Sequence, residues 1–124
     1  MMVVDQRERP ADAAASEQAD RLFAALADAT RRDIVRRATQ APHSVSSLAR
    51  HYPMSFAAVQ RHVAVLERAG VVTKERRGRE QLVRTDVETL RSVHSLLDQL
   101  ESVWRERIER FGDVLAEPDG GATR

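Results

Sequence analysis

An apolar stripe with helical spacing occupies the last third of this 124-residue chain. The apolar positions alternate in steps of three and four residues: Leu90, Val93, Leu97, Leu100, Trp104, Ile108, Phe111 and Leu115. No Pro or Gly lies between Asp86 and Gly112, so the pattern predicts one helix of roughly 26–30 residues, about 40 Å long at 1.5 Å per residue. The rest of so small a chain cannot cover such a stripe, and we predict that a second copy does.

The composition of this single domain restricts the fold and the kinds of site that it can have. Aromatic residues are only 4% of the chain, so its core is built from Ala, Val, Leu and Ile, which favours helices. The chain has no Cys, which excludes disulfides, thiolate metal sites and cysteine nucleophiles. Because no apolar run approaches roughly 18 residues and the N-terminus does not resemble a signal peptide, we expect a cytoplasmic protein with no membrane partner.

We expect three segments along the chain. Residues 1–16 contain Pro10 and no sustained apolar period, which predicts a disordered N-terminal tail. Residues 17–116 form the domain. Residues 117–124 have linker composition and are expected to be a disordered C-terminal tail.

Two helices are expected before the centre of the chain. Ser16 is placed to cap a first helix that ends near Leu26, and Asp28 to cap a second over residues 29–39. The second helix has an inward apolar face and an outward face of four arginines. These two faces are Ile34, Val35 and Ala38, and Arg31, Arg32, Arg36 and Arg37.

A helix-turn-helix is expected next. Ser46 is placed to cap one or two helical turns before Pro53, and Ser55 to cap a longer helix over residues 56–69 that Gly70 ends. Two helices joined by so tight a connection are typical of a motif whose second helix enters a groove of DNA.

A β-hairpin is expected after that motif, because residues 71–77 and 80–85 flank Gly78. A hairpin in this position is a wing. The predicted fold class is mainly α with a small β-hairpin: a winged helix-turn-helix with a long terminal dimerisation helix.

Charge is segregated along the chain although its net value is only +1. Residues 20–84 carry 13 Lys and Arg against 6 Asp and Glu, whereas residues 85–124 carry 5 against 9. A basic centre between acidic ends suggests a polyanionic partner for the centre. A merely solvated basic face is the alternative.

Four segments in this order resemble the ArsR (arsenic-repressor) family of winged-helix bacterial transcriptional regulators. They are residues 26–35, 45–49, 55–72 and 77–81, within a similarity that runs from about residue 20 to residue 111. The resemblance implies a homodimer that represses transcription on an inverted-repeat operator in double-stranded DNA. It also implies a dimer interface formed by the first and last helices, for which the candidates are Leu22, Leu90, Val93, Leu97, Leu100, Trp104 and Ile108.

The DNA-binding candidates come from three regions. The resemblance assigns base contacts to the outward turns of the helix that Ser55 caps, where Arg61 suits guanine and Gln60 suits adenine. Phe56 offers only apolar contact, or else folds back onto the start of its helix. Cations of the wing suit the minor groove or phosphates, or are solvated. The full set is Thr30, Arg31, Ser46, Ser55, Phe56, Ala57, Gln60, Arg61, Arg76, Arg77, Gly78 and Arg79.

The sequence departs from the metal sensors of that family. Their cysteine pair is missing from residues 45–49, and their Asp, His, His and Glu ligands of the last helix correspond at best to Glu88, Gln99 and Ser102 here. Two milder departures are Ala29, where the family usually has Pro, and Leu82, where it has an aromatic residue. We expect no metal and no cofactor.

Three alternatives remain open at this stage. His94, Asp98 and Glu101 share a helix face and could form a zinc site across a dimer. A small molecule could instead control DNA binding, or the winged helix could be a protein–protein interaction module. No enzyme is expected, because no nucleophile, acid–base pair or phosphate loop can be assembled.

Overall fold

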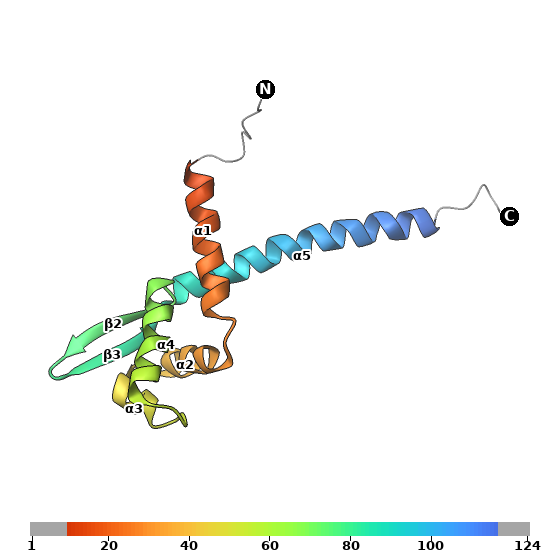
Figure 1. The fold of residues 1–124 in the computed structure, drawn as a ribbon. Helices are drawn as coiled ribbons and strands as arrows, with labels where there is room; N and C mark the ends of the chain where they lie inside the picture. Colours follow the sequence, from red (N-terminus) through yellow and green to blue (C-terminus); the bar gives the residue numbers. More distant parts are fainter. Residues whose placement is uncertain (1–9, 117–124) are drawn as a thin grey trace. The chain divides into compact units, whose positions relative to one another are not determined.

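The computed structural model describes residues 10–116, and residues 1–9 and 117–124 lie outside the description (Figure 1). The elements, in chain order, are α1 (Pro10–Ala25), α2 (Ala29–Gln40), β1 (His43–Ser44), α3 (Val45–Ala49), α4 (Phe56–Arg68), β2 (Val72–Arg77), β3 (Glu80–Thr85) and α5 (Val87–Ala116). The chain divides into two units, residues 1–93 and residues 94–124. The first contains the core and the candidate site, and the second contains the described remainder of α5.

The core of the first unit is aliphatic, as the low aromatic content predicts. Its largest fully buried side chains are Leu22, Ile34, Leu48, Leu66, Val59, Val63, Val71, Val72 and Val83. Leu22 and Val93, both predicted at the dimer interface, are only 2% and 8% exposed and belong to this core. Helical spacing identified them as apolar positions but could not show that their own chain largely covers them, and their place in a dimer interface stays a prediction.

Side-chain caps begin α2 and α4 where the sequence predicts. Oδ2 of Asp28 accepts a hydrogen bond of 3.0 Å from the backbone N–H of Arg31, and Oγ of Ser55 accepts one of 3.0 Å from that of Ala58. Each bond satisfies one of the free N–H groups at a helix start. Asp86 similarly accepts from the N–H of Glu88 at 3.0 Å at the start of α5.

Two helix starts differ from the prediction. α3 is capped by Ser44, whose Oγ accepts from the N–H of Ser47 at 3.0 Å, rather than by Ser46. α1 begins at Pro10 rather than at Ser16. Proline is compatible with the first helical turn and the alanines that follow favour helix, so residues 10–16 are helical and not the tail that we predicted. The rest of that tail and residues 117–124 fall outside the described residues.

The wing is a three-stranded sheet with strand order β1-β3-β2, where the sequence predicted two strands. β1 pairs antiparallel with β3, joining His43 to Val83 and Ser44 to Leu82. A two-residue strand has no readable period, so no sequence pattern predicts it. Because Ser44 is both the cap of α3 and a strand residue, the wing is joined directly to the start of the helix-turn-helix.

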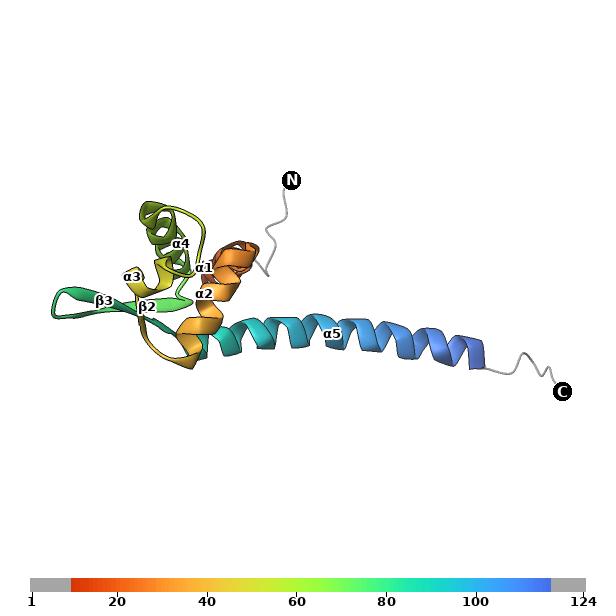
Figure 2. The same cartoon turned by 90° about the horizontal axis from the view of Figure 1, so that it is seen from below.

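Glycines end α4 and form the tip of the wing as predicted. Gly70 and Gly78 have φ of +82° and +64°, a region that other residues rarely adopt. In Figure 2, α3 and α4 lie on the same side of the β2–β3 hairpin. The helix-turn-helix and the wing therefore form one continuous body.

The second unit is described by α5 alone from His94 onward. The full helix has 30 residues and continues through Gly112 to Ala116, which agrees with the length predicted from the stripe. Its large apolar side chains are 49–71% exposed in the single chain: Leu97, Leu100, Val103, Trp104, Ile108, Phe111, Val114 and Leu115. Among the helices of residues 10–116, none has the length and apolar character that a membrane span requires.

Candidate nucleic-acid interface

α4 is anchored on one face and open on the other. Val59, Val63 and Leu66 are 0% exposed, whereas Gln60 and Arg61 lie on the solvent face of the same turns. The buried row fixes the rotation of the helix about its axis. The two long polar side chains predicted to read bases are thereby held outward together.

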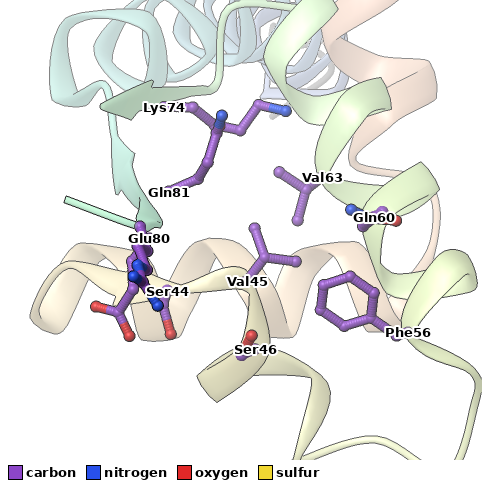
Figure 3. A pocket seen from close by; sticks show the side chains of 10 residues that line it. Ser44, Val45, Ser46, Phe56, Gln60, Val63, Lys74, Glu80 and Gln81 are labelled. Atoms are coloured by element: carbon purple, nitrogen blue, oxygen red, sulfur yellow. The ribbon is translucent and has the colours of Figure 1, made fainter. Parts of the chain in front are cut away.

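A hollow of about 320 Å³ lies between α3, the first half of α4 and the wing (Figure 3). Four predicted residues line it: Ser46, Phe56, Gln60 and Arg79. The sequence analysis missed four further polar lining residues, Ser44, Lys74, Glu80 and Gln81. β1 brings Ser44 there, and β2 and β3 bring the other three. The missing signal for Ser44 was the pairing of β1 with β3.

Phe56 is directed at α3 and remains partly exposed, and its contact with DNA stays a prediction. Figure 3 shows its ring pointing back toward Val45 and Ser46 of α3, yet the side chain is 46% exposed. The ring therefore joins the two helices of the motif and still presents an apolar edge at the rim of the hollow. Ser55 and Ala57, beside it, are exposed and do not line the hollow.

The arginines of the wing are not equivalent. Nη2 of Arg77 lies 3.5 Å from Oε2 of Glu75, whose Oε1 lies 3.5 Å from Nε of Arg84. Arg76 and Arg79 are exposed and have no ion-pair partner in the described part of the chain. Of the three predicted wing cations, these two retain their full charge for a partner, whereas Glu75 offsets the charge of Arg77.

Arg31, predicted to reach DNA, is occupied inside the fold. Its Nε donates to the carbonyl oxygen of Ala25 at 2.7 Å, and its Nη2 to that of Ala24 at 3.2 Å. Its Nη1 lies 3.2 Å from Nδ1 of His62 on α4. Through these three contacts the guanidinium of Arg31 joins the C-terminus of α1 to α2 and α4. The sequence could not show the contacts with α1, because their acceptors are main-chain atoms. Thr30, beside it, is half-buried.

Asp28 interacts electrostatically with Arg31 and His62, in the corner where α1, α2 and α4 meet. The N–H of Arg31 that it accepts is the main cause that lowers the pKa of its carboxyl, with nearby His62 adding to the effect. Nδ1 of His62 lies 3.9 Å from Oδ2 of Asp28. His62 follows Arg61 in the chain, so this corner touches the helix that carries the candidate base contacts.

A second network holds the turn that precedes α4. The Tyr52 hydroxyl donates to Oδ2 of Asp33 at 2.7 Å, and Nε of Arg37 donates to the same oxygen at 2.8 Å. Arg36 pairs with Oδ1. These donors, Tyr52 first, hold the pKa of Asp33 far below its usual range, while burial and Asp33 raise the pKa of Tyr52 to about 12.

The candidate zinc residues of α5 do not converge in the single chain. Nε2 of His94 lies 3.7 Å from Oδ2 of Asp98, whereas Glu101 pairs with Arg105 at 2.9 Å. Across residues 10–116, no three His, Asp or Glu side chains are grouped closely enough to hold a metal ion. The expectation of no metal stays a prediction.

Comparison with known proteins identifies the family. The family described as "Helix-turn-helix domain" matches residues 26–75. The HTH-type transcriptional regulator Rv2034 of Mycobacterium tuberculosis is 39% identical over 96 residues, which is 77% of this chain and 87% of that protein. The match therefore extends beyond the DNA-binding motif itself.

Solved structures similar to this chain indicate the same kind of protein. An ArsR-like transcriptional regulator from Rhodococcus sp. RHA1 is 30% identical with a TM-score of 0.72, covering 84% of this chain and 97% of its own. A homodimeric winged helix-turn-helix DNA-binding domain from Mycobacterium bovis shares the fold at 22% identity and a TM-score of 0.63, covering 82% of this chain and 91% of its own. The resemblance seen in the sequence and the predicted fold class are confirmed: the chain belongs to the ArsR family of winged helix-turn-helix transcriptional regulators.

Proposed function

We propose that this protein is a homodimeric, sequence-specific repressor that binds an inverted-repeat operator in double-stranded DNA. The observation that carries the proposal is the outward pair Gln60 and Arg61 on α4, beside a wing whose Arg76 and Arg79 have no acidic partner among the described residues. Long polar side chains on an anchored helix suit base edges in the major groove, and free cations suit phosphates or the minor groove.

The proposed contacts follow from what each residue has available. Gln60 and Arg61 read bases, with Ala57 and the exposed edge of Phe56 offering apolar contact to thymine methyl groups. Ser46 and Ser55 hydroxyls, the helix start behind Ser55 and the wing tip around Gly78 contact the backbone. Arg77 contributes less than its neighbours because Glu75 lies beside it, and Arg31 acts through the fold rather than on DNA.

The dimer rests on the exposed stripe of α5. Large apolar side chains from Leu97 to Leu115 are about half exposed or more in the single chain, and an apolar surface of that length is stable in water only when something covers it. A second copy presents an identical, self-complementary stripe. The M. bovis domain of the same fold is homodimeric, which supports a homodimer here. Leu90, half-buried against the core, continues the stripe toward the DNA-binding unit.

Two further parts belong to the proposal. The DNA-binding and dimerisation domain is one functional piece within residues 17–116, extended at its start by the helical residues 10–16, and it acts in the cytoplasm where operator DNA is accessible.

Thiophilic metals do not control DNA binding, since the chain has no Cys and soft metals select thiolates. Control is then left to a small molecule, to a partner protein or to the amount of protein made.

The decisive experiment is to sequence the genomic fragments that the purified full chain retains. We expect a shared inverted repeat whose half-sites are centred about 34–36 Å apart or a multiple of that distance. Binding to one such fragment should weaken steeply with salt, with a log–log slope near −0.9 per phosphate contacted. Retention of no common sequence, together with salt-insensitive binding, would favour a protein–protein interaction module instead.

A further inference from the structure

Three arginines converge on a second hollow, away from the one at the wing. It has a volume of about 250 Å³ and lies between the C-terminal parts of α1 and α4. Arg21 of α1, Arg31 of α2 and Arg68 of α4 line it, and within the described part of the chain no carboxylate does. None of these residues lines the hollow beside the wing. We call this site the α1–α4 hollow.

Arg31 presents a guanidinium that is already fixed in place. Three of its five N–H groups point at Ala25, Ala24 and His62, which leaves two for another acceptor. Because the fold has already ordered this side chain, an anion that binds it does not incur that loss of entropy. The guanidinium is thus a preorganised donor at the hollow.

Arg21 and Arg68 are the exposed counterparts of Arg31. Both are exposed, and neither has an ion-pair partner among residues 13–115, whose side chains the structure describes. The acids nearest in sequence to Arg31 and Arg68 are engaged elsewhere: Asp33 accepts from Tyr52 and Arg37, and Glu67 lies 3.3 Å from Nζ of Lys74. Three positive charges therefore face the hollow without a local counter-charge from its lining.

The remaining lining is apolar and small. Ala24, Val65 and Ala69 contribute no polar side-chain atom, and Ala25 and Ala69 are almost fully buried at 1% and 4% exposed. A surface of methyl groups bounded by guanidinium groups complements a molecule with a compact apolar body and one anionic end. Inorganic anions use only the cationic half of such a site.

We propose that the α1–α4 hollow binds a small organic anion, a carboxylate whose compact apolar body packs on Ala24, Val65 and Ala69 while Arg21, Arg31 and Arg68 hold its charge. The bound carboxylate takes the two remaining N–H groups of Arg31. Since Arg31 also contacts His62, next to Arg61, the ligand joins the corner where α1, α2 and α4 meet.

Benzoate is a suitable probe, and the test uses the full chain without DNA. Benzoate, benzamide and inorganic phosphate are titrated in turn while backbone amide resonances are followed by NMR. We expect saturable shifts with benzoate, centred on residues 24–25 and 65–69, and weaker binding of both benzamide and phosphate. Arg21→Ala and Arg68→Ala should each weaken benzoate roughly tenfold, the usual cost of a charged hydrogen bond.

The matched control is Arg76→Ala, which removes an exposed arginine of the wing and should leave benzoate affinity unchanged. Arg31 is left intact because its loss disturbs the fold. The proposal is overturned by any of three results: no saturable shift, equal binding of benzamide or phosphate, or unchanged affinity in both variants. In a separate titration with duplex DNA, shifts at the hollow that benzoate does not produce would also overturn the proposal, since the arginines would then be contacts to the DNA backbone.

Discussion

The hydroxyl of Tyr52 donates a hydrogen bond of 2.7 Å to the carboxylate of Asp33. Tyr52 lies in the turn between the two helices of the DNA-binding motif, and Asp33 lies on α2, 19 residues earlier. The same carboxylate accepts from Arg37 at 2.8 Å. This contact fixes the turn that leads into α4, and it makes the position of the recognition helix depend on an ionised side chain.

The stability of the fold should therefore depend on pH through Asp33. Its folded pKa lies below the usual value, so the stabilisation is present above about pH 4 and is lost as the pH falls toward the folded pKa. Asp33→Asn should lower the free energy of unfolding at neutral pH and approach the parent protein in acid, as measured by urea unfolding. Glu88→Gln, in an exposed pair with Arg91, is the control; an equal deficit at both pH values would contradict the assignment.

Arg61 should carry sequence specificity. Arg61→Ala is expected to weaken operator binding by about 1–3 kcal/mol, the worth of one bidentate base contact, with a smaller loss on random DNA. Arg76→Ala should weaken both equally and reduce the salt slope by about 0.9. Fluorescence anisotropy on the two DNAs measures the difference. Equal losses for Arg61→Ala would make Arg61 a phosphate contact.

The stripe of α5 should control assembly. Leu100 is 64% exposed in the single chain, so Leu100→Glu places a charge where a second copy is proposed to pack, and Leu97→Glu does the same one turn earlier. Sedimentation should find monomers that no longer hold two half-sites at once. Gln99→Glu introduces the same charge on a neighbouring position off the stripe and should leave the dimer intact. A parent protein that is monomeric at micromolar concentration and still binds a full operator would refute the dimer.

Arg31 should matter for stability before it matters for DNA. Arg31→Ala leaves the carbonyl oxygens of Ala24 and Ala25 without this donor and removes the contact with His62. Hydrogen bonds from a charged donor are worth on the order of 1–3 kcal/mol, and we expect a loss of that size in the free energy of unfolding. Arg32→Ala, which removes one exposed bond to Leu26, should cost less. Full stability with a reduced salt slope would restore Arg31 to the DNA contacts.

DNA binding should not respond to arsenite or cadmium, because the chain offers these metals no thiolate. A mobility-shift assay with chelator and then with arsenite, cadmium and zinc tests this. Zinc is the informative arm, since His94 and Asp98 lie within 3.7 Å of each other and a partner chain could complete a site. A large zinc effect that disappears in His94→Ala would make the protein a zinc sensor.

Much of the fold is determined by local chemistry that the sequence displays directly. Asp28 and Ser55 cap their helices because each has a side-chain oxygen within reach of N–H groups three residues on. Gly78 forms the wing tip because the turn needs a positive φ. The apolar row on α4 and the length of α5 follow from helical period alone. Each of these depends on neighbours along the chain, so the pattern of residue types was sufficient.

Tertiary structure decided which surfaces and charges remain available. Leu22 and Arg31 carry the same sequence signals as an interface leucine and a DNA-contacting arginine, yet the fold buries the first and commits the second to main-chain carbonyls. β1 forms only because β3, some forty residues later, offers an edge to it. The Asp33–Tyr52 bond likewise joins separate elements. Such pairings depend on distances between segments far apart in the chain, and residue type alone does not encode those distances.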